Sequence, residues 1–327
     1  YVAPFQNLSA LNVFLITLTL MVGTAGLPHV IIRFYTVPKA SDARWSAGWA
    51  LVFIGLLYTT APAVAVFSKY NLLNTLANKP VEEVRQIDWV QKWEQTGLLK
   101  LQDKNGDGIL QMSANPDVNE VTIDRDIIVL STPEVAKLSP FIVGLVAAGG
   151  LAAALSTAAG LLIVIASAIS HDLYTRLINP GASEATKLLI ARVVIFLVVV
   201  LAAPFGINPP AFIAQLVAFA FGLAASTFFP AILLGIFDRR MNMQGAVAGM
   251  IVGLVFTASY IIGTKYLGWP NFILGITAEG IGAIGMLLNF VVAYLVSRAT
   301  PPPPEEIQHL VDEIRIPKGS AGSALEH

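Results

Sequence analysis

Apolar residues in this chain stand in long blocks separated by polar segments, rather than at the short periods of a soluble fold. Crossing a bilayer takes about 20 mostly apolar residues. Seven stretches meet that requirement, and they are 11–34, 46–67, 139–169, 186–205, 210–237, 244–264 and 273–298. The pattern predicts an all-α integral membrane protein with about seven transmembrane helices.

The polar segments divide the chain further. Residues 68–138 form an insert that holds most of the acidic residues, between two helices in 1–67 and five helices in 139–298. Residues 299–324 form a tail that opens with four prolines, a composition typical of extended chain. Residues 325–327 resemble an affinity-tag scar. Because the chain opens with Tyr1, we expect it to begin partway through a longer protein.

Lys and Arg in the short connections predict the orientation, because cytoplasmic loops of membrane proteins are enriched in these residues. The connections 35–45, 170–185 and 238–243 carry them, whereas 206–209 is uncharged and 265–272 has one lysine. We therefore expect a multi-pass protein of the cell membrane. The start of the chain and the insert would lie outside, and the tail in the cytoplasm.

Composition supports the membrane assignment and narrows the function. The 327 residues are 55% hydrophobic and 13% charged, against about 25% charged in soluble domains. The mean hydropathy is +0.70. No basic cluster points to nucleic acid, and no hydrolase, zinc-protease or phosphate-binding motif is present, so the chain is not expected to be an enzyme. The absence of cysteine excludes disulfides and thiolate metal sites.

The segment MVGTAGLPH, residues 21–29, interrupts the first span. Glycine and proline free backbone groups that lipid cannot satisfy, so such a break belongs inside protein or beside a wet cavity. Transporters place broken helices at their substrate sites. A proline kink packed against neighbouring helices is the alternative. The candidate substrate-binding residues here are Gly23, Thr24, Gly26, Pro28 and His29.

Three further spans carry polar side chains in apolar surroundings. Ser156 and Thr157 form an adjacent hydroxyl pair, and hydroxyl and carbonyl oxygens suit a hard cation such as Na⁺; hydrogen bonding within or between helices is the alternative. Gln215, Ser226 and Thr227 would line a polar cavity, and Gln215 and Ser226 would contact the substrate, with packing as the alternative. The lone Asn289 in the last span predicts a hydrogen bond between helices.

The insert contains DKNGDGIL, residues 103–110, which fits the first half of an EF-hand-type Ca²⁺ loop. Asp103, Asn105 and Asp107 would supply side-chain ligands, and Ile109 its carbonyl. The fit ends at the twelfth position, where Ala114 replaces the expected acid, and Asp117 or Glu120 could substitute in an irregular loop. An Asx-rich turn is the alternative, so Ca²⁺ is only a possible ligand.

Several segments together resemble the sodium:solute symporter family over about residues 5–320. GIFDRRMNMQGAVAGMIVGLV (235–255) resembles the family signature, LAAALSTAAGLLIVIASAISHDLY (151–174) its sodium-site helix, and GTAGLPHVIIRFYTV (23–37) its broken substrate-site helix. The DKNGDG insert, the segment around INPPAFIAQL and the proline-rich tail look similar to the cation/acetate symporter branch.

This resemblance implies a LeuT-like fold, in which the chain supplies the second inverted repeat and two peripheral helices. It implies Na⁺ binding by the Ser156 and Thr157 hydroxyls and the Ala153 carbonyl. The remaining ligands would come from the N-terminal half of the same transporter, which the chain lacks. The implied activity is Na⁺-coupled transport of a small organic solute by alternating access, with a short-chain monocarboxylate such as acetate as the expected anion. A symporter-like membrane sensor and a channel are the alternatives.

Overall fold

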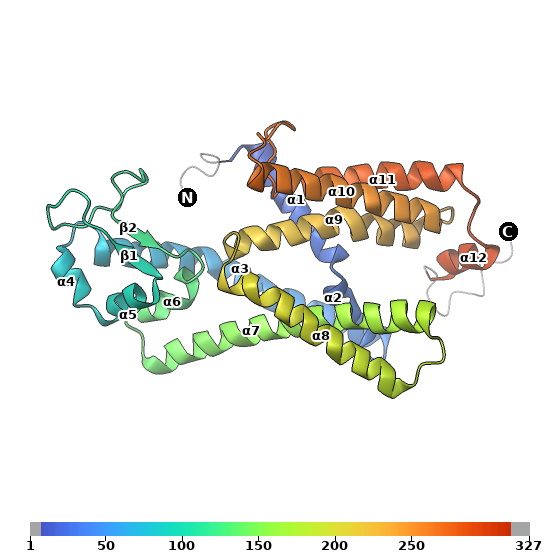
Figure 1. The fold of residues 1–327 in the computed structure, drawn as a ribbon, viewed down its shortest axis with the longest axis horizontal. Coiled ribbons are helices and arrows are strands. Elements are labelled where there is room, and N and C mark those ends of the chain that lie inside the picture. Colours follow the sequence, from blue (N-terminus) through green and yellow to red (C-terminus); the bar gives the residue numbers. More distant parts are fainter. Residues whose placement is uncertain (1–7, 315–327) are drawn as a thin grey trace. The chain divides into compact units, whose positions relative to one another are not determined.

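The computed structural model describes residues 8–314 and divides the chain into two compact units (Figure 1). The first unit comprises Tyr1–Tyr35 and Val200–His327, and the second comprises Thr36–Val199. Residues 1–7 and 315–327, which include the end of the predicted tail and the tag-like terminus, lie outside the described part.

The first unit is a bundle of membrane helices followed by a short tail helix. Its elements are α1 (Ala10–Gly26), α2 (Pro28–Ile31), the 3₁₀ helix η1 (Ile32–Tyr35), α9 (Ile213–Phe237), α10 (Met243–Tyr266), α11 (Gly282–Ala299) and α12 (Glu305–Glu313). Helix α8 (Glu184–Ile207) begins in the second unit and ends in this one.

A row of glycines lets α10 pack closely against its neighbours. Gly245, Gly249 and Gly253 recur at every fourth position and therefore share one face of the helix. A Cβ atom on Gly249 would lie 2.2 Å from Oδ1 of Asn289 on α11, and one on Gly253 would lie 1.9 Å from the Ser226 carbonyl oxygen on α9. No side chain larger than hydrogen fits at these positions. Small residues thus bring three backbones together, as is common between membrane helices.

Asn289 repairs the helix that Pro230 interrupts. Proline has no N–H, so Pro230 leaves the carbonyl of Ser226, four residues earlier in α9, without its helical donor. The Asn289 side-chain amide donates to the carbonyl oxygens of Ser226 (2.8 Å) and Thr227 (2.9 Å). Asn289 is fully buried. The hydrogen bond between helices expected from this residue is therefore confirmed.

One face of α1 fastens the helix to α9 and to the start of α11. The Asn12 amide donates to the Gly275 carbonyl (2.9 Å) and accepts from the Thr277 N–H (2.8 Å). Two turns along, the Thr19 hydroxyl donates to the Gly280 carbonyl (3.2 Å) and accepts from the Ala283 N–H (3.0 Å). Ala283 lies in the first turn of α11, where backbone N–H groups lack helical acceptors, so Thr19 caps α11 from another helix.

The second unit holds three long apolar helices and the insert. Its elements are α3 (Ala40–Leu76), α4 (Val81–Arg85), α5 (Asp88–Thr96), β1 (Leu99–Leu101), β2 (Val121–Ile123), α6 (Ile128–Val135), α7 (Pro140–Ser167), the π-helix η2 (Ala168–Ile178) and most of α8. The apolar windows of α3 and α8 are almost wholly uncovered within the described structure, with Val194 of α8 as the exception.

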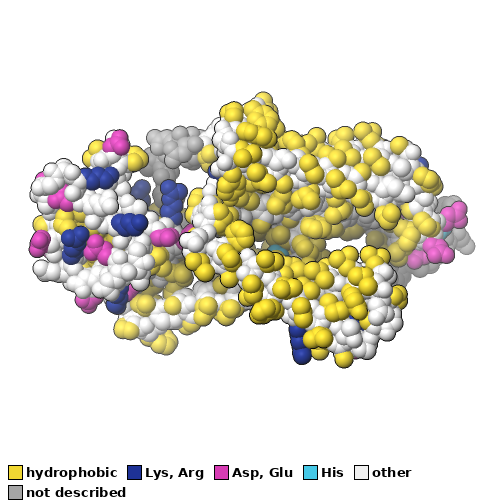
Figure 2. Space-filling view, in the orientation of Figure 1, with side chains coloured by type: hydrophobic (Ala, Val, Ile, Leu, Met, Phe, Trp, Pro, Cys, Tyr) yellow, Lys and Arg dark blue, Asp and Glu magenta, His cyan; other side chains and the backbone are white. Residues whose placement is uncertain are grey.

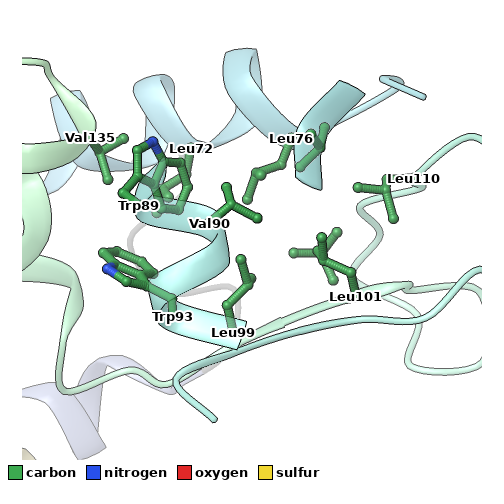
Figure 3. Close-up of a cluster of buried hydrophobic side chains, with 11 residues drawn as sticks. Leu72, Leu76, Trp89, Val90, Trp93, Leu99, Leu101, Leu110 and Val135 are labelled. Carbon is green, nitrogen blue, oxygen red and sulfur yellow. The ribbon is translucent and has the colours of Figure 1, made fainter. Parts of the chain in front are cut away.

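The insert has a hydrophobic core of its own (Figure 3). The alternating patterns LKL and VTI form the antiparallel pair β1–β2, with Leu99 opposite Ile123 and Leu101 opposite Val121. Trp89 and Trp93, one turn apart on α5, pack edge to face at 4.7 Å between ring centroids. Helix α3 continues past its predicted end at 67 as far as Leu76, because Leu72 and Leu76 join this core.

Among the described residues, six helices are long and apolar enough to cross a membrane, against seven predicted spans. The remaining predicted span, 11–34, contains the 17-residue apolar helix α1. Several boundaries also differ from the prediction. Residues 273–281, predicted as the start of the last span, are a loop instead, and α11 begins only at Gly282. In the first span the helix runs through Gly26, so the break falls at Leu27 rather than across residues 23–29.

Figure 2 shows charged side chains gathered over the insert and near α12, while the surfaces of the long helices are mostly hydrophobic. Together with the six spans, this distribution defines a multi-pass α-helical membrane protein.

Replacing Asn289 by Ala is expected to destabilise the first unit. Interhelical polar contacts in membranes average about 0.6 kcal/mol, because the separated helices find other partners. The Ser226 carbonyl has no helical alternative, so the penalty for an unsatisfied buried group, about 1–3 kcal/mol, applies here. Denaturation of the chain in bicelles would measure the loss, with Leu287→Ala on the exposed side of α11 as the control. Equal stability of the two variants would contradict this role for Asn289.

Candidate functional site

The chain breaks its first membrane helix at Leu27 and Pro28. Leu27 adopts an extended conformation (φ −76°, ψ 117°), and its N–H reaches back only to the Thr24 carbonyl, at 3.4 Å. The N–H groups of Val30 and Ile31 both donate to the Leu27 carbonyl. In a continuous helix the Val30 N–H would donate to the Gly26 carbonyl instead. Backbone groups at the end of α1 and the start of α2 are therefore available to other partners.

The two glycines before the break serve helix packing. A Cβ atom on Gly23 would lie 2.4 Å from the Phe221 carbonyl oxygen, and one on Gly26 would lie 2.8 Å from that of Ala224. Both glycines are buried against α9. They fix the position of the break relative to α9, and neither offers an exposed group to a ligand.

A cavity of about 490 Å³ adjoins the break. Leu27 and Pro28 form part of its wall, and the remaining lining residues come from α9 and α10: Ala220, Leu223, Ala224, Thr227, Phe228, Val247, Met250, Ile251 and Leu254. Thr227 is the lone polar side chain in this lining, and its hydroxyl donates to the Leu223 carbonyl (2.6 Å). The cavity therefore suits an apolar group, and a carboxylate would need its hydrogen bonds from elsewhere.

Thr24 and His29 flank the break and differ in their partners. The Thr24 hydroxyl donates to the Leu20 carbonyl in its own helix (2.7 Å) and is exposed. His29 occupies the second position of α2, where a backbone N–H has no acceptor within the helix. Its ring atom Nδ1 is buried and has no hydrogen-bond partner in the described structure. His29 therefore has unused hydrogen-bonding capacity.

The structure places Gln215 and Ser226 away from this cavity. Gln215, in the first turn of α9, donates to the Glu279 carboxylate, which also pairs with Lys265 at 3.0 Å. The fully buried Ser226 side chain donates to the Leu223 carbonyl (3.1 Å). Their contacts are those expected from the packing alternative, and substrate contact by either residue stays a prediction.

Residues 275–283 are a polar junction that the sequence analysis missed. They contact α1 through Asn12 and Thr19, α9 through Gln215, and α10 through Lys265 and through the Tyr260 hydroxyl, which donates to the Ile276 carbonyl (2.7 Å). Two polar residues seven apart in an apolar span, Asn12 and Thr19, were the available signal. Such spacing places both on one helix face.

The predicted sodium ligands lie on α7 in the second unit. Ala153, Ser156 and Thr157 are exposed there, and the Thr157 hydroxyl donates to the Ala153 carbonyl at 3.1 Å. This contact is the one expected from the alternative of hydrogen bonding within the helix. Na⁺ binding by Ala153, Ser156 and Thr157 stays a prediction. Among the described residues, no group of three or more acidic, His or Cys side chains is placed to hold a metal ion.

The predicted calcium loop is ordered by hydrogen bonds from its own backbone. Asp103 accepts from the N–H groups of Gly106 (2.7 Å) and Gly108 (2.9 Å), and Asp107 accepts from that of Ile109 (2.8 Å). The Ile109 bond, with smaller effects from Asn105 and Gln111, lowers the pKa of Asp107. These contacts are those of an Asx-rich turn. Calcium binding by Asp103, Asn105, Asp107 and Ile109 stays a prediction.

The buried carboxylate of Glu120 holds this loop in place. It accepts from the N–H groups of Lys104 (2.8 Å), Asn105 (3.4 Å) and Gln111 (2.8 Å), and the residue is only 2% exposed. The loop is thus built around a carboxylate whose oxygens accept from backbone N–H groups. Glu120 as a substitute calcium ligand stays a prediction.

Comparison with known proteins relates this membrane protein to one family. Residues 112–253 match the model of the sodium:solute symporter family. This stretch contains the hydroxyl pair of α7, Pro230 and the glycine row of α10. The resemblance predicted from the sequence motifs is therefore confirmed over this stretch.

Two relatives extend the match. The chain is 41% identical over 313 residues to an uncharacterized symporter of Cupriavidus necator, which covers 93% of the chain and 45% of the relative. It is 31% identical over 252 residues to a monocarboxylic acid transporter of Corynebacterium glutamicum, covering 73% of the chain and 36% of the relative. The chain thus spans less than half the length of these relatives. Both have transporter names, in agreement with the prediction that the chain is not an enzyme.

Replacing Glu279 by Gln is expected to change how stability depends on pH. Burial tends to raise the pKa of Glu279, but hydrogen bonds outweigh it, the largest effect coming from Gln215 and a smaller one from Lys265, so the net pKa is lowered. A lowered carboxylate pKa adds stability at neutral pH, and this is lost as the pH falls through the folded-state value. Because the pair is partly exposed, we expect a contribution below about 1 kcal/mol.

The stability difference between the parent chain and Glu279→Gln should therefore be largest at neutral pH and vanish in acid. Denaturation in bicelles across this pH range would measure it, with Glu306→Gln on α12 as the control. A difference that stays constant with pH would contradict the role of the Glu279 charge.

Proposed function

We propose that this chain is the C-terminal part of a Na⁺-coupled transporter for a small organic anion. The observation that carries the proposal is the helix break at Leu27 and Pro28, which borders a cavity and leaves His29 Nδ1 buried without a partner. The family match and the transporter names of the relatives support the same activity.

The proposed sodium site consists of the Ser156 and Thr157 hydroxyls and the Ala153 carbonyl. Three oxygens leave a Na⁺ ion short of ligands, and the face of α7 that carries them is exposed in the described structure. We propose that the N-terminal half of the transporter covers this face and supplies the remaining ligands. Coupling then follows if Na⁺ binds one conformation of the complete protein better than the other.

For the substrate we propose a short-chain monocarboxylate such as acetate. The apolar cavity would accept the alkyl part, while Thr24, His29 and the backbone at the break, helped by the first half of the protein, would contact the carboxylate. Gly23, Gly26 and Pro28 would contribute by fixing the shape of the break. This division of roles fits a cavity wall in which Thr227 is the single polar side chain.

The proposed setting is the cell membrane, with the start of the chain and the insert outside and the tail inside. In this orientation the chain forms the second repeat of a LeuT-like fold with α10 and α11 as additional helices. The insert, if it binds Ca²⁺ at 103–109, would do so on the outer side. A sensor and a channel are less well supported, because both relatives are named as transporters.

Removing the hydroxyl pair on α7 is expected to weaken Na⁺ binding. In the complete transporter, Ser156→Ala with Thr157→Ala should raise the Na⁺ concentration needed for half-maximal uptake by about tenfold or more, which corresponds to 1.4 kcal/mol of lost binding energy. Thr59→Ala with Thr60→Ala removes a comparable pair of hydroxyls bonded within α3, and it should leave the Na⁺ dependence unchanged. An unchanged Na⁺ dependence in the α7 variant would contradict the proposed ion site.

Counterflow with labelled short monocarboxylates would identify the substrate in the complete transporter. We expect acetate or a close homologue to exchange, and His29→Ala to raise the substrate concentration needed for half-maximal exchange. His309→Ala on the tail helix is the matched control. Exchange that ignores every monocarboxylate would contradict the proposed substrate class, whereas an unaffected His29→Ala would remove only that residue from the site.

A further inference from the structure

The tail helix α12 has an apolar face that no other described residue covers. Ile307, Leu310 and Ile314 are 46%, 52% and 55% exposed, whereas Val311 is buried. With about 100° between successive residues, these four side chains occupy an arc of roughly 100° on the helix. An apolar arc of this width is the pattern of a helix that buries one side.

Helix α12 contacts the rest of the first unit through a different side. Asp312 pairs with Arg239, in the loop after α9, at 3.2 Å. On the helix, Asp312 is displaced from Val311 by roughly 100°, and Leu310 by roughly 100° in the opposite direction. The side of α12 that contacts the rest of the first unit is therefore centred between Val311 and Asp312. Ile307, Leu310 and Ile314 lie outside this contact side.

The end of the bundle where α12 lies is also where three spans leave the apolar region. Helix α9 ends at Phe237, α10 begins at Met243 and α11 ends at Ala299. Arg298 pairs with Asp238 at 3.0 Å, and the Asn242 amide donates to the Thr300 hydroxyl (2.7 Å). These two contacts hold the ends of the three helices together. A concentration of charged residues directly after apolar spans marks the bilayer boundary.

Only residues 300–304 separate α11 from α12, so the tail helix stays close to this boundary (Figure 1). The exposed apolar side of α11, with Val291 and Leu295, approaches the same end. Helix α12 thus follows, after a five-residue linker, a span whose exposed side carries apolar residues. Glu306 and Glu313, on the side of α12 away from Val311, would remain in water.

We propose that α12 lies in the interface of the bilayer, with Ile307, Leu310 and Ile314 inserted between the lipid headgroups. The ion pair between Arg239 and Asp312 holds the helix to the end of α9, and the apolar face then rests on the lipid. Helix α12 thereby links the end of α9 to the membrane surface. This inference does not depend on what the protein transports.

Site-directed spin labelling would test the proposal, because the chain contains no cysteine and each introduced one is unique. The variants are Leu310→Cys on the apolar face and Glu313→Cys on the acidic side as the matched control, each in the full chain in phosphatidylcholine nanodiscs. Oxygen concentrates in lipid and a neutral nickel chelate in water. The ratio of oxygen to nickel accessibility should therefore be severalfold higher at position 310 than at 313.

Two results would overturn the proposal. Equal nickel accessibility at both positions would place the apolar face in water. Low accessibility to both reagents at 310 would mean that protein, from another part of the chain or a second copy, covers the face. Ile307→Cys repeats the measurement one turn earlier and covers the case in which the variant at 310 does not fold.

Discussion

The constraint that shapes this protein is that a backbone group within a bilayer must find its hydrogen bond inside the protein. Pro28 and Pro230 each lack a backbone N–H, and the consequences differ. At Pro230 the Asn289 amide replaces the lost donor, and α9 continues to Phe237. At Pro28 the helix stops, its last N–H reaches back at 3.4 Å, and His29 retains an unpartnered nitrogen. Pro230 is therefore compensated by a hydrogen bond from a neighbouring helix, whereas the break at Pro28 leaves polar groups available.

The bundle of α1, α9, α10 and α11 is fastened at three levels along its length. The junction at residues 275–283 ties one end, Asn289 ties the middle, and the pair of Asp238 and Arg298 ties the other end. Between these levels, glycines bring the backbones close enough for side-chain amides and hydroxyls to reach carbonyl groups. Lipid competes poorly for such polar contacts, so a few of them fix how the helices pack. The broken end of α1 therefore packs against a bundle that polar contacts fix at three levels.

The second unit contains two parts that place their apolar side chains differently. Its insert folds around a core that includes Trp89, Trp93 and Leu76, as a small soluble domain would. Its long helices instead keep their apolar side chains outward, which is stable where lipid or more protein surrounds them. Helix α3 serves both parts, since its middle is apolar on all sides and its last two turns supply Leu72 and Leu76 to the insert.

The sequence by itself determined the class of protein, the long apolar spans, the resemblance to one transporter family and the presence of a break near Pro28, because these follow from hydrophobic run length and from local residue chemistry. It also identified Asn289 as a contact between helices, since a lone amide in hydrocarbon needs a partner. Only the tertiary structure decided which partner that was. It likewise decided that Gly23 and Gly26 pack on α9, that Gln215 joins Glu279, and that the last span starts at Gly282. These outcomes depend on which helix faces approach each other, and pairings between residues more than 60 positions apart leave no periodic trace in the chain.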